Sequence, residues 1–160
     1  METNDQFDRE PALIAVVSTM CTLSMIGSTL IIFSYIKWQD LRTVSRKLLV
    51  FLSIADFWTA AGNFWGSFNT QDNLSCTVQS AITTYSSMSS FFWTTFIALY
   101  LYLCMPGHSK NPEKYVVWFH IVSWFLPLGI VIIAWTMDAL GPSPVGWCWI
   151  NKEKPHDLMW

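Results

Sequence analysis

Charged side chains are scarce in this sequence. Lysine, arginine, aspartate and glutamate make up 12% of its 160 residues, whereas they supply about 25% of an ordinary soluble domain. The few charges are also bunched between long uncharged stretches, so a soluble fold of this length would have too little polar surface to cover its apolar residues. This scarcity favours a membrane protein over the alternative, a soluble protein with an unusually apolar core.

Several kinds of functional site are also missing from the sequence. It has no Cys and His pattern with metal-ligand spacing, no nucleotide-binding glycine loop and no pair of acidic residues placed for acid–base catalysis. The net charge is -2, and no basic tract follows an aromatic stacking pattern, which argues against a nucleic-acid partner. We therefore expect no enzyme, no metal site and no cofactor.

Hydrophobic residues are abundant, at 52% of the chain. A helix that crosses a bilayer needs about 20 predominantly apolar residues, and four stretches meet this requirement. The predicted spans are residues 12–36, 48–68, 78–105 and 115–137. The start METNDQFDREP is acidic where a secretory signal peptide is basic, so we expect the first span to be retained. The predicted fold is all-α, a polytopic transmembrane helical bundle in contact with membrane lipids.

The basic residues predict the orientation of the bundle. Six of the nine lie in the connections 37–47 and 106–114: Lys37, Arg42, Arg46, Lys47, Lys110 and Lys114. Because cytoplasmic loops are rich in lysine and arginine, these two connections are predicted to be cytoplasmic. Residues 1–11 and 69–77 are then extracellular, and residues 138–160 are predicted to hold the second extracellular loop and the start of a truncated fifth span. Asn73 begins an Asn-Leu-Ser glycosylation sequon on this outer side, close to the membrane.

Two of the four cysteines, Cys76 and Cys148, fall on the predicted outer side, and the other two lie in apolar stretches. The extracellular side is oxidising, so these two can form a disulfide. The alternative is a pair of free thiols.

Asp56 lies in the middle of LLVFLSIADFWTAAGNFWGSF, residues 48–68, which is otherwise uncharged. An aspartate at the centre of an inserting helix costs about 2.5 to 3.5 kcal/mol, so such a residue is a functional candidate with polar partners. Asn63, Ser90 and Thr94 are the expected members of an intramembrane polar network around it. The alternative is a protonated aspartate that is hydrogen-bonded for helix packing alone.

The third span is rich in serine and threonine between residues 83 and 95. Hydroxyl side chains let membrane helices pack closely, and the alternative is that they line a ligand pocket. If a pocket exists, aromatic residues near the outer side are its expected walls. These candidates are Trp65, Tyr85, Trp147 and Trp149.

Four segments together resemble a known receptor family: LRTVSRKLLVFLSIADF (41–57), SSFFWTTFIALYLYL (89–103), FHIVSWFLP (119–127) and VGWCWI (145–150). They are similar to the orphan G-protein-coupled receptors of the receptor-157 type, which are related to the slime-mould cyclic AMP receptors and, more distantly, to the secretin and adhesion receptors. Trp93, Tyr100 and Tyr102 match the secretin-type third-helix motif, although Ile97 stands where that motif has an acidic residue. Cys76 and Cys148 match the cysteines of the family's outer disulfide.

The resemblance implies a seven-helix receptor that passes an extracellular signal, from a ligand not yet identified, to a heterotrimeric G protein, with phosphoinositide and calcium signalling downstream. It also implies the plasma membrane, with the ciliary membrane as a possible site. We expect the chain to hold only the first four of seven helices and to be unable to signal alone. Two alternatives remain: a four-span interaction protein, and a dominant-negative fragment that pairs with a full-length receptor.

Overall fold

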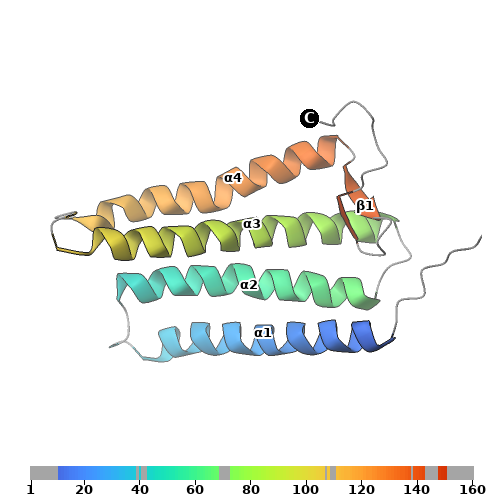
Figure 1. Ribbon diagram of the computed structural model, residues 1–160, viewed down its shortest axis with the longest axis horizontal. Coiled ribbons are helices and arrows are strands. Elements are labelled where there is room, and N and C mark those ends of the chain that lie inside the picture. Colours follow the sequence, from blue (N-terminus) through green and yellow to red (C-terminus); the bar gives the residue numbers. More distant parts are fainter. Residues whose placement is uncertain are drawn as a thin grey trace, which may run out of the picture.

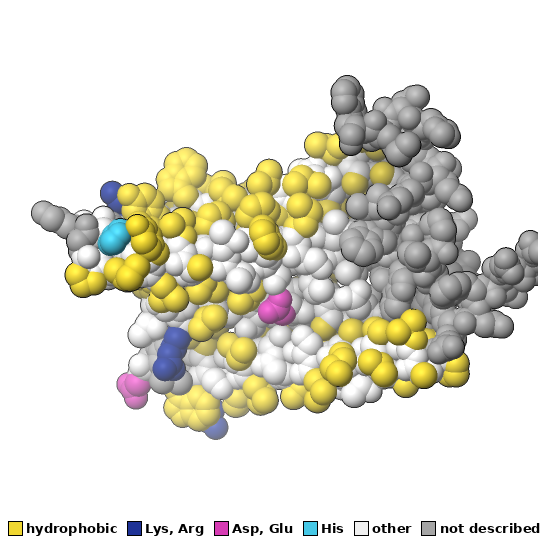
Figure 2. Space-filling model, viewed as in Figure 1, with side chains coloured by type: hydrophobic (Ala, Val, Ile, Leu, Met, Phe, Trp, Pro, Cys, Tyr) yellow, Lys and Arg dark blue, Asp and Glu magenta, His cyan; other side chains and the backbone are white. Residues whose placement is uncertain are grey.

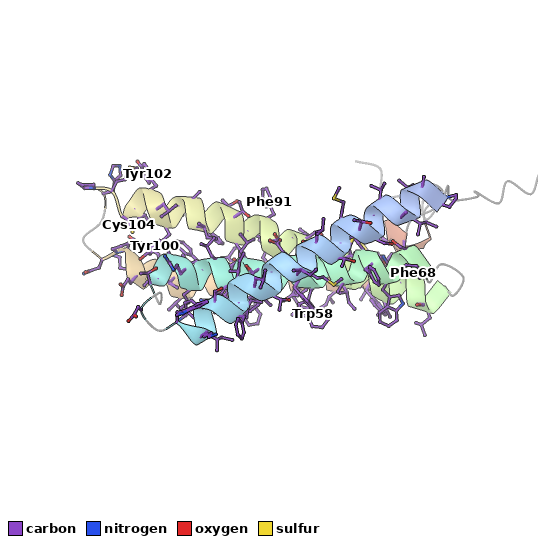
Figure 3. The ribbon with its side chains drawn as sticks, turned by 90° about the horizontal axis from the view of Figure 1, so that it is seen from below. Trp58, Phe68, Phe91, Tyr100, Tyr102 and Cys104 are labelled. Carbon is purple, nitrogen blue, oxygen red and sulfur yellow. A yellow bond between two sulfur atoms is a disulfide. The ribbon has the colours of Figure 1, made fainter. Side chains whose placement is uncertain are left out.

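The computed structural model describes residues 11–38, 40, 43–68, 73–106, 108, 111–137, 139–142 and 148–150. Its long helices are α1 (Pro11–Lys37), α2 (Val44–Phe68), α3 (Asn73–Leu103) and α4 (Val116–Thr136), and a short 3-10 helix, Pro112–Tyr115, leads into α4. The four helices lie side by side in sequence order and run in alternating directions (Figure 1). Short connections force each helix to pack against the one before it. Seen from below, α1 crosses its neighbours obliquely (Figure 3).

The bundle carries its apolar side chains on the outside. Large hydrophobic residues of α1 and α4 are exposed along the full length of both helices. Figure 2 shows hydrophobic side chains over both of these helices, and most of the visible charged groups lie at one end of the bundle. Serines and one glutamine supply many of the buried positions instead. A soluble monomer rarely exposes so much contiguous apolar surface, whereas lipid-facing helices must. The expectation of a helical membrane bundle is confirmed.

Three helical segments are long and apolar enough to cross a membrane by length and composition: Pro11–Lys37, Val44–Phe68 and Pro112–Thr136. The fourth long helix, α3, has 31 residues and no charged side chain, but its many hydroxyl groups make it less apolar. It is also the helix between α2 and α4. Because Gln79 and three serines of α3 are buried in the bundle, α3 does not need the apolar composition of a lipid-facing helix.

Many hydroxyl side chains inside the helices bond to their own helix backbone. Ser53 Oγ donates to the Leu49 carbonyl at 2.9 Å, Ser86 Oγ to Ile82 at 2.7 Å and Thr59 Oγ1 to Ala55 at 3.0 Å. Such bonds to the carbonyl four residues earlier satisfy the hydroxyl without a partner on another helix. This local bonding explains how an apolar bundle holds so many serines and threonines.

A two-stranded sheet caps one end of the bundle beside the start of α3. Strand β1 (Leu140–Pro142) pairs antiparallel with β2 (Cys148–Ile150), and Pro142 lies opposite Cys148. The disulfide between Cys76 and Cys148 joins β2 to the first turn of α3, with a Cα–Cα distance of 5.2 Å. This disulfide agrees with the pairing predicted from the sequence, whereas the strands were not predicted.

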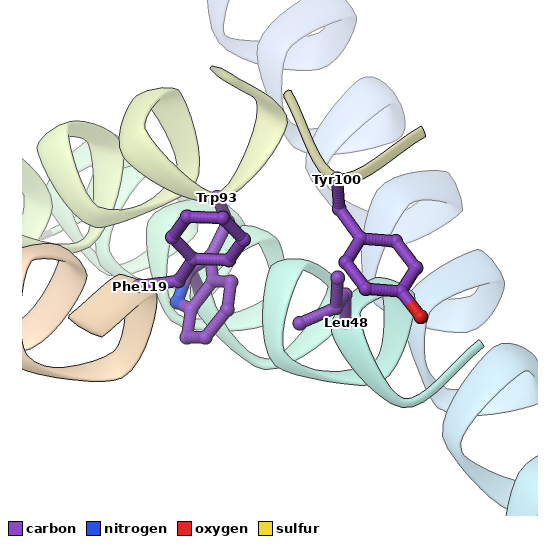
Figure 4. Close-up of a cluster of buried hydrophobic side chains, with 5 residues drawn as sticks. Leu48, Trp93, Tyr100 and Phe119 are labelled. Carbon is purple, nitrogen blue, oxygen red and sulfur yellow. The ribbon is translucent and has the colours of Figure 1, made fainter. Parts of the chain in front are cut away.

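The main core lies in the half of the bundle away from the sheet. It is formed by Leu48, Ala55, Trp93, Tyr100 and Phe119, which are all buried. Figure 4 shows Leu48 of α2 between the rings of α3 and α4. These three helices are therefore held together by one aromatic cluster, whereas α1 contributes only Cys21 and Ser28 to the buried residues.

Candidate functional site

The Asp56 carboxylate lies at the contact between α2 and α3. Ser90 Oγ of α3 donates a hydrogen bond to Asp56 Oδ1, and both residues are partly buried. The sequence analysis expected a polar partner for Asp56, and the structure brings Ser90 to it. This is a cross-helix side-chain bond in a membrane bundle, where the carboxylate has little water to bond instead.

The other two expected members of the network are placed differently. Thr94 is exposed, and its Oγ1 donates to the Ser90 carbonyl of its own helix at 3.0 Å. Asn63 lies two turns along α2 from Asp56, and its backbone carbonyl accepts a bond from Ser67 Oγ at 3.0 Å. Of the three expected partners, Ser90 is therefore the one with a described hydrogen bond to the Asp56 side chain.

Two glycines let α2 approach α3 closely on the side of Asp56 that leads to the sheet. A Cβ atom added to Gly62 would lie 2.6 Å from Thr83 Oγ1, and one added to Gly66 would overlap the side-chain amide of Gln79. The Thr83 hydroxyl and Gln79 Oε1 are buried without a hydrogen-bond partner in the described structure. The sequence analysis did not select these residues, although the Gly-x-x-x-Gly spacing of Gly62 and Gly66 is a known signal for close helix contact.

An aromatic cluster joins α2, α3 and α4 on the other side of Asp56. Trp93 is fully buried and stacks on Phe51 with ring centroids 5.2 Å apart. His120 meets both rings edge-on, at 4.4 Å from Phe51 and 4.8 Å from Trp93, and Trp124 approaches Trp93 at 5.9 Å. Edge-to-face and stacked pairs of this kind add to the stability gained from burial alone. Trp93 thus fixes three helices at one point.

The two tyrosines of the third-helix motif have different environments. Tyr100 is buried in the aromatic core, whereas Tyr102 is 49% exposed near the end of α3 (Figure 3). The Tyr102 hydroxyl lies 2.8 Å from His108 Nε2, and the two rings meet edge-on at 4.3 Å. Tyr100 therefore serves packing, and Tyr102 holds the turn that follows α3.

An open apolar groove of about 410 Å³ crosses α3 between α2 and α4. Its aromatic lining residues are Trp58, Tyr85, Trp124 and Trp135. Of the four expected pocket residues, Tyr85 lines this groove, while Trp65 does not and is 58% exposed. Trp147 and the side chain of Trp149 lie outside the described residues.

The remaining expected sites lie near the sheet. Asn73 is the first residue of α3, and its side chain is outside the described part of the structure. Thr77 Oγ1, one turn later, donates to the Leu140 carbonyl of β1 at 3.5 Å. The sheet is thus fastened to α3 by a disulfide and a hydrogen bond. Within the described ranges, no group of three His, Cys, Asp or Glu side chains could hold a metal ion.

Comparison with known proteins gives a consistent family. Residues 3–156 match the family model described as "Slime mold cyclic AMP receptor". The chain is 41% identical to the G-protein coupled receptor 157 of Mus musculus over 154 residues, and 40% identical to that of Homo sapiens over 158. These alignments cover 91% and 94% of this chain. The Cyclic AMP receptor-like protein A of Dictyostelium discoideum is 26% identical over 136 residues, which cover 85% of this chain and 36% of that protein.

The chain spans about half the length of the two mammalian relatives, 47% in each case. The matched region includes all four long helices and the strand pair. The family model covers nearly the whole sequence, and the exposed apolar helices and the disulfide-linked cap agree with it. The chain belongs to the slime mold cyclic AMP receptor family.

Proposed function

We propose that this chain forms the first four helices of a seven-helix receptor that passes an extracellular signal to a heterotrimeric G protein. The observation that carries the proposal is the hydrogen bond between Asp56 and Ser90 in the interior of the membrane bundle. An ionisable side chain is costly there, and its partner lies on a different helix. A contact of this kind can favour one of two helix arrangements, which is what a receptor needs.

The outer end of the bundle is suited to receive the signal. The strand pair is tied to α3 by the Cys76–Cys148 disulfide and follows directly after α4. A ligand that moves the sheet would therefore move the first turn of α3. Because α3 is a continuous helix from Asn73 to Leu103, such a shift would reach Ser90 and then the opposite end. Phosphoinositide and calcium signalling are the proposed downstream pathway.

The basic end of the bundle is the proposed cytoplasmic face. The connections 37–47 and 106–114 hold six of the nine lysines and arginines, and this asymmetry supports an extracellular N-terminus. We place the receptor in the plasma membrane, with the ciliary membrane as a more specific proposal. An epitope tag before residue 11 should be accessible to antibody on intact cells, whereas a tag within residues 106–114 should be accessible only after permeabilisation. The opposite pattern would refute the orientation.

A chimaera tests the receptor function directly. Residues 11–150 of this chain replace the matching region of the mouse G-protein coupled receptor 157, and G-protein dissociation is measured by resonance energy transfer, normalised to surface display. We expect the chimaera to activate a G protein above vector-transfected cells, and residues 1–160 alone to remain at the vector level. A chimaera that reaches the surface but is inactive under conditions where the intact mouse receptor is active would overturn the proposal.

A second candidate is pairing of these four helices with a full-length receptor, which would reduce the receptor at the surface. It is supported by an apolar face of α3 that no described helix covers: Phe91 is 69% exposed and points away from α2 (Figure 3). Co-expression of residues 1–160 with the mouse receptor should then lower its surface amount, and Phe91→Ser should restore it. Pairing without loss of surface receptor would favour a four-span interaction protein instead.

A further inference from the structure

A second groove lies between α1 and α2, at the end of the bundle away from the sheet. Its volume is about 330 Å³, within the range of about 300 to 1,000 Å³ that is typical of small-molecule sites. Helix α1 contributes Leu30, Ile31, Ser34 and Tyr35, and α2 contributes Arg46, Leu49 and Val50. Figure 2 shows basic side chains gathered at this end of the bundle. The groove shares none of its lining residues with the Asp56 contact or with the aromatic cluster.

The groove changes from polar to apolar along its length. Arg46 is the third residue of α2, and Leu49 and Val50 lie one turn deeper. On α1, Tyr35 lies near the end at Lys37, and Leu30 and Ile31 lie one turn deeper. Both helices therefore place polar groups at the same level and aliphatic side chains beyond it. A bilayer has the same order, with charged headgroups outside and hydrocarbon inside.

Arg46 supplies a positive charge at the polar end of the groove, and none of the described lining residues is acidic. Arg46 is exposed, and its recorded hydrogen bond in the described structure uses the backbone N–H, which donates to Thr43 Oγ1 at 3.4 Å. Asp40 is the one acidic residue in the sequence of the connection 37–47, which also contains four basic residues. A guanidinium with its donors free binds phosphate well, because its planar fork can make two hydrogen bonds to phosphate oxygens.

We propose that this groove binds one anionic phospholipid, with its headgroup phosphate on Arg46 and an acyl chain against Leu30, Ile31, Leu49 and Val50. A second copy of the chain is a poorer fit, because an apolar partner helix would bury the Arg46 charge without a counterion. On the proposed orientation the site faces the cytoplasmic leaflet, which holds the anionic lipids. The site depends on the α1–α2 contact and does not require that the chain activate a G protein.

Native mass spectrometry of the chain, released from bilayers of equal phosphatidylserine and phosphatidylcholine, tests this site. We expect one phosphatidylserine to be retained in preference to phosphatidylcholine. Arg46→Gln should lower this retention about fivefold, the factor that corresponds to about 1 kcal/mol for one basic residue at the membrane surface. Lys114→Gln is the matched control. Lys114 lies on the same proposed side of the membrane, in the 3-10 helix before α4, and does not line the groove. It should leave retention unchanged.

A second pair of variants tests the apolar part of the groove. Ile31→Trp should fill it and reduce retention of either lipid, whereas Ile132→Trp, on exposed α4 surface, should not. Equal losses in Arg46→Gln and Lys114→Gln, or equal retention of both lipids by the unchanged chain, would overturn the proposal. Release of the lipid by excess inorganic phosphate, or a mass that corresponds to a second chain in place of the lipid, would also overturn it.

Discussion

At the scale of single residues, Asp56 is the side chain whose position most needs an explanation. It is the single acidic residue of α2, and its carboxyl group accepts a hydrogen bond from a serine hydroxyl of α3. Cross-helix hydrogen bonds in membrane proteins contribute about 0.6 kcal/mol on average and up to about 1.7 kcal/mol. A bond of this size stabilises the bundle modestly, and modest stabilisation is what allows an equilibrium between two arrangements to shift.

Removal of the Ser90 hydroxyl should measure that contribution. We expect Ser90→Ala to lower the free energy of unfolding in detergent by about 0.6 to 1.7 kcal/mol, because the carboxylate loses its described donor. Thermal unfolding followed by near-ultraviolet circular dichroism gives the value. The matched control is Ser87→Ala, an exposed serine of the same helix, which should change stability little. If both variants lose the same amount, the Asp56–Ser90 bond does not stabilise the bundle.

The sequence was sufficient to select Asp56, because one charge within an apolar stretch is visible without any structure. It was not sufficient to choose among the candidate partners. Ser90 and Thr94 are one turn apart on α3, and only the rotation and register of α3 against α2 decide which of them reaches the carboxylate. The same limit applies to Trp65 and Tyr85, since hydropathy gives the presence of a helix but not which face meets the groove.

At the scale of elements, the close contact between α2 and α3 depends on two glycines of α2. Gly62 and Gly66 lie one turn apart on α2, and each faces a polar side chain of α3 at close range. Small residues are frequent at membrane helix contacts because they allow the backbones to approach. The glycines bring α3 near enough for its polar side chains to be buried against α2.

A methyl group at this contact should separate the helices. We expect Gly62→Ala to lower the free energy of unfolding by about 1 to 3 kcal/mol, the usual cost of overpacking, because the new Cβ would lie 2.6 Å from Thr83 Oγ1. Gly27→Ala is the control, since nothing lies within 4 Å of a Cβ there, and alanine should improve helix propensity. The two variants should shift the unfolding midpoint in opposite directions, and a shift in the same direction would contradict close packing at Gly62.

The strand pair is the element that sequence patterns did not predict. Each strand has three residues, and one reads Leu-Gly-Pro, which lacks the alternation and β-branched residues that indicate a strand. The strands form next to the start of α3, where the disulfide and the Thr77 bond to Leu140 hold them. Their structure is imposed by tertiary contacts, so local composition could not reveal it.

At the scale of the whole molecule, the disulfide links the beginning of α3 to a segment 72 residues later. It therefore connects the two ends of the α3–α4 hairpin through the sheet. In the chain-entropy model, a disulfide that closes a loop of this size stabilises the fold by at most about 4 kcal/mol. The stabilisation should be smaller here, because helices held in a membrane are already restricted. The link matters most for keeping the strand pair on α3.

Loss of this link should affect stability without affecting insertion. We expect Cys76→Ser to lower the unfolding midpoint, and the double variant with Cys148→Ser to resemble it, because either change removes the same bond. Cys104→Ser should behave as the unchanged chain, since Cys104 is an exposed free cysteine. Unfolding in detergent under non-reducing conditions gives the comparison. A double variant much less stable than the single one would mean that Cys148 acts through other contacts.

Because this bundle exposes apolar side chains and buries serines, its folding should be observed by other signals than those used for soluble proteins. Burial of apolar surface from water gives soluble proteins their large heat-capacity change on unfolding, but here many apolar side chains face outward and many buried side chains are serines. Each helix satisfies its own backbone, so heating in a micelle should separate intact helices. Far-ultraviolet helicity would then stay nearly constant while Trp93 loses its neighbours. Aromatic signals, and not helix content or calorimetry, should report whether the receptor bundle is assembled.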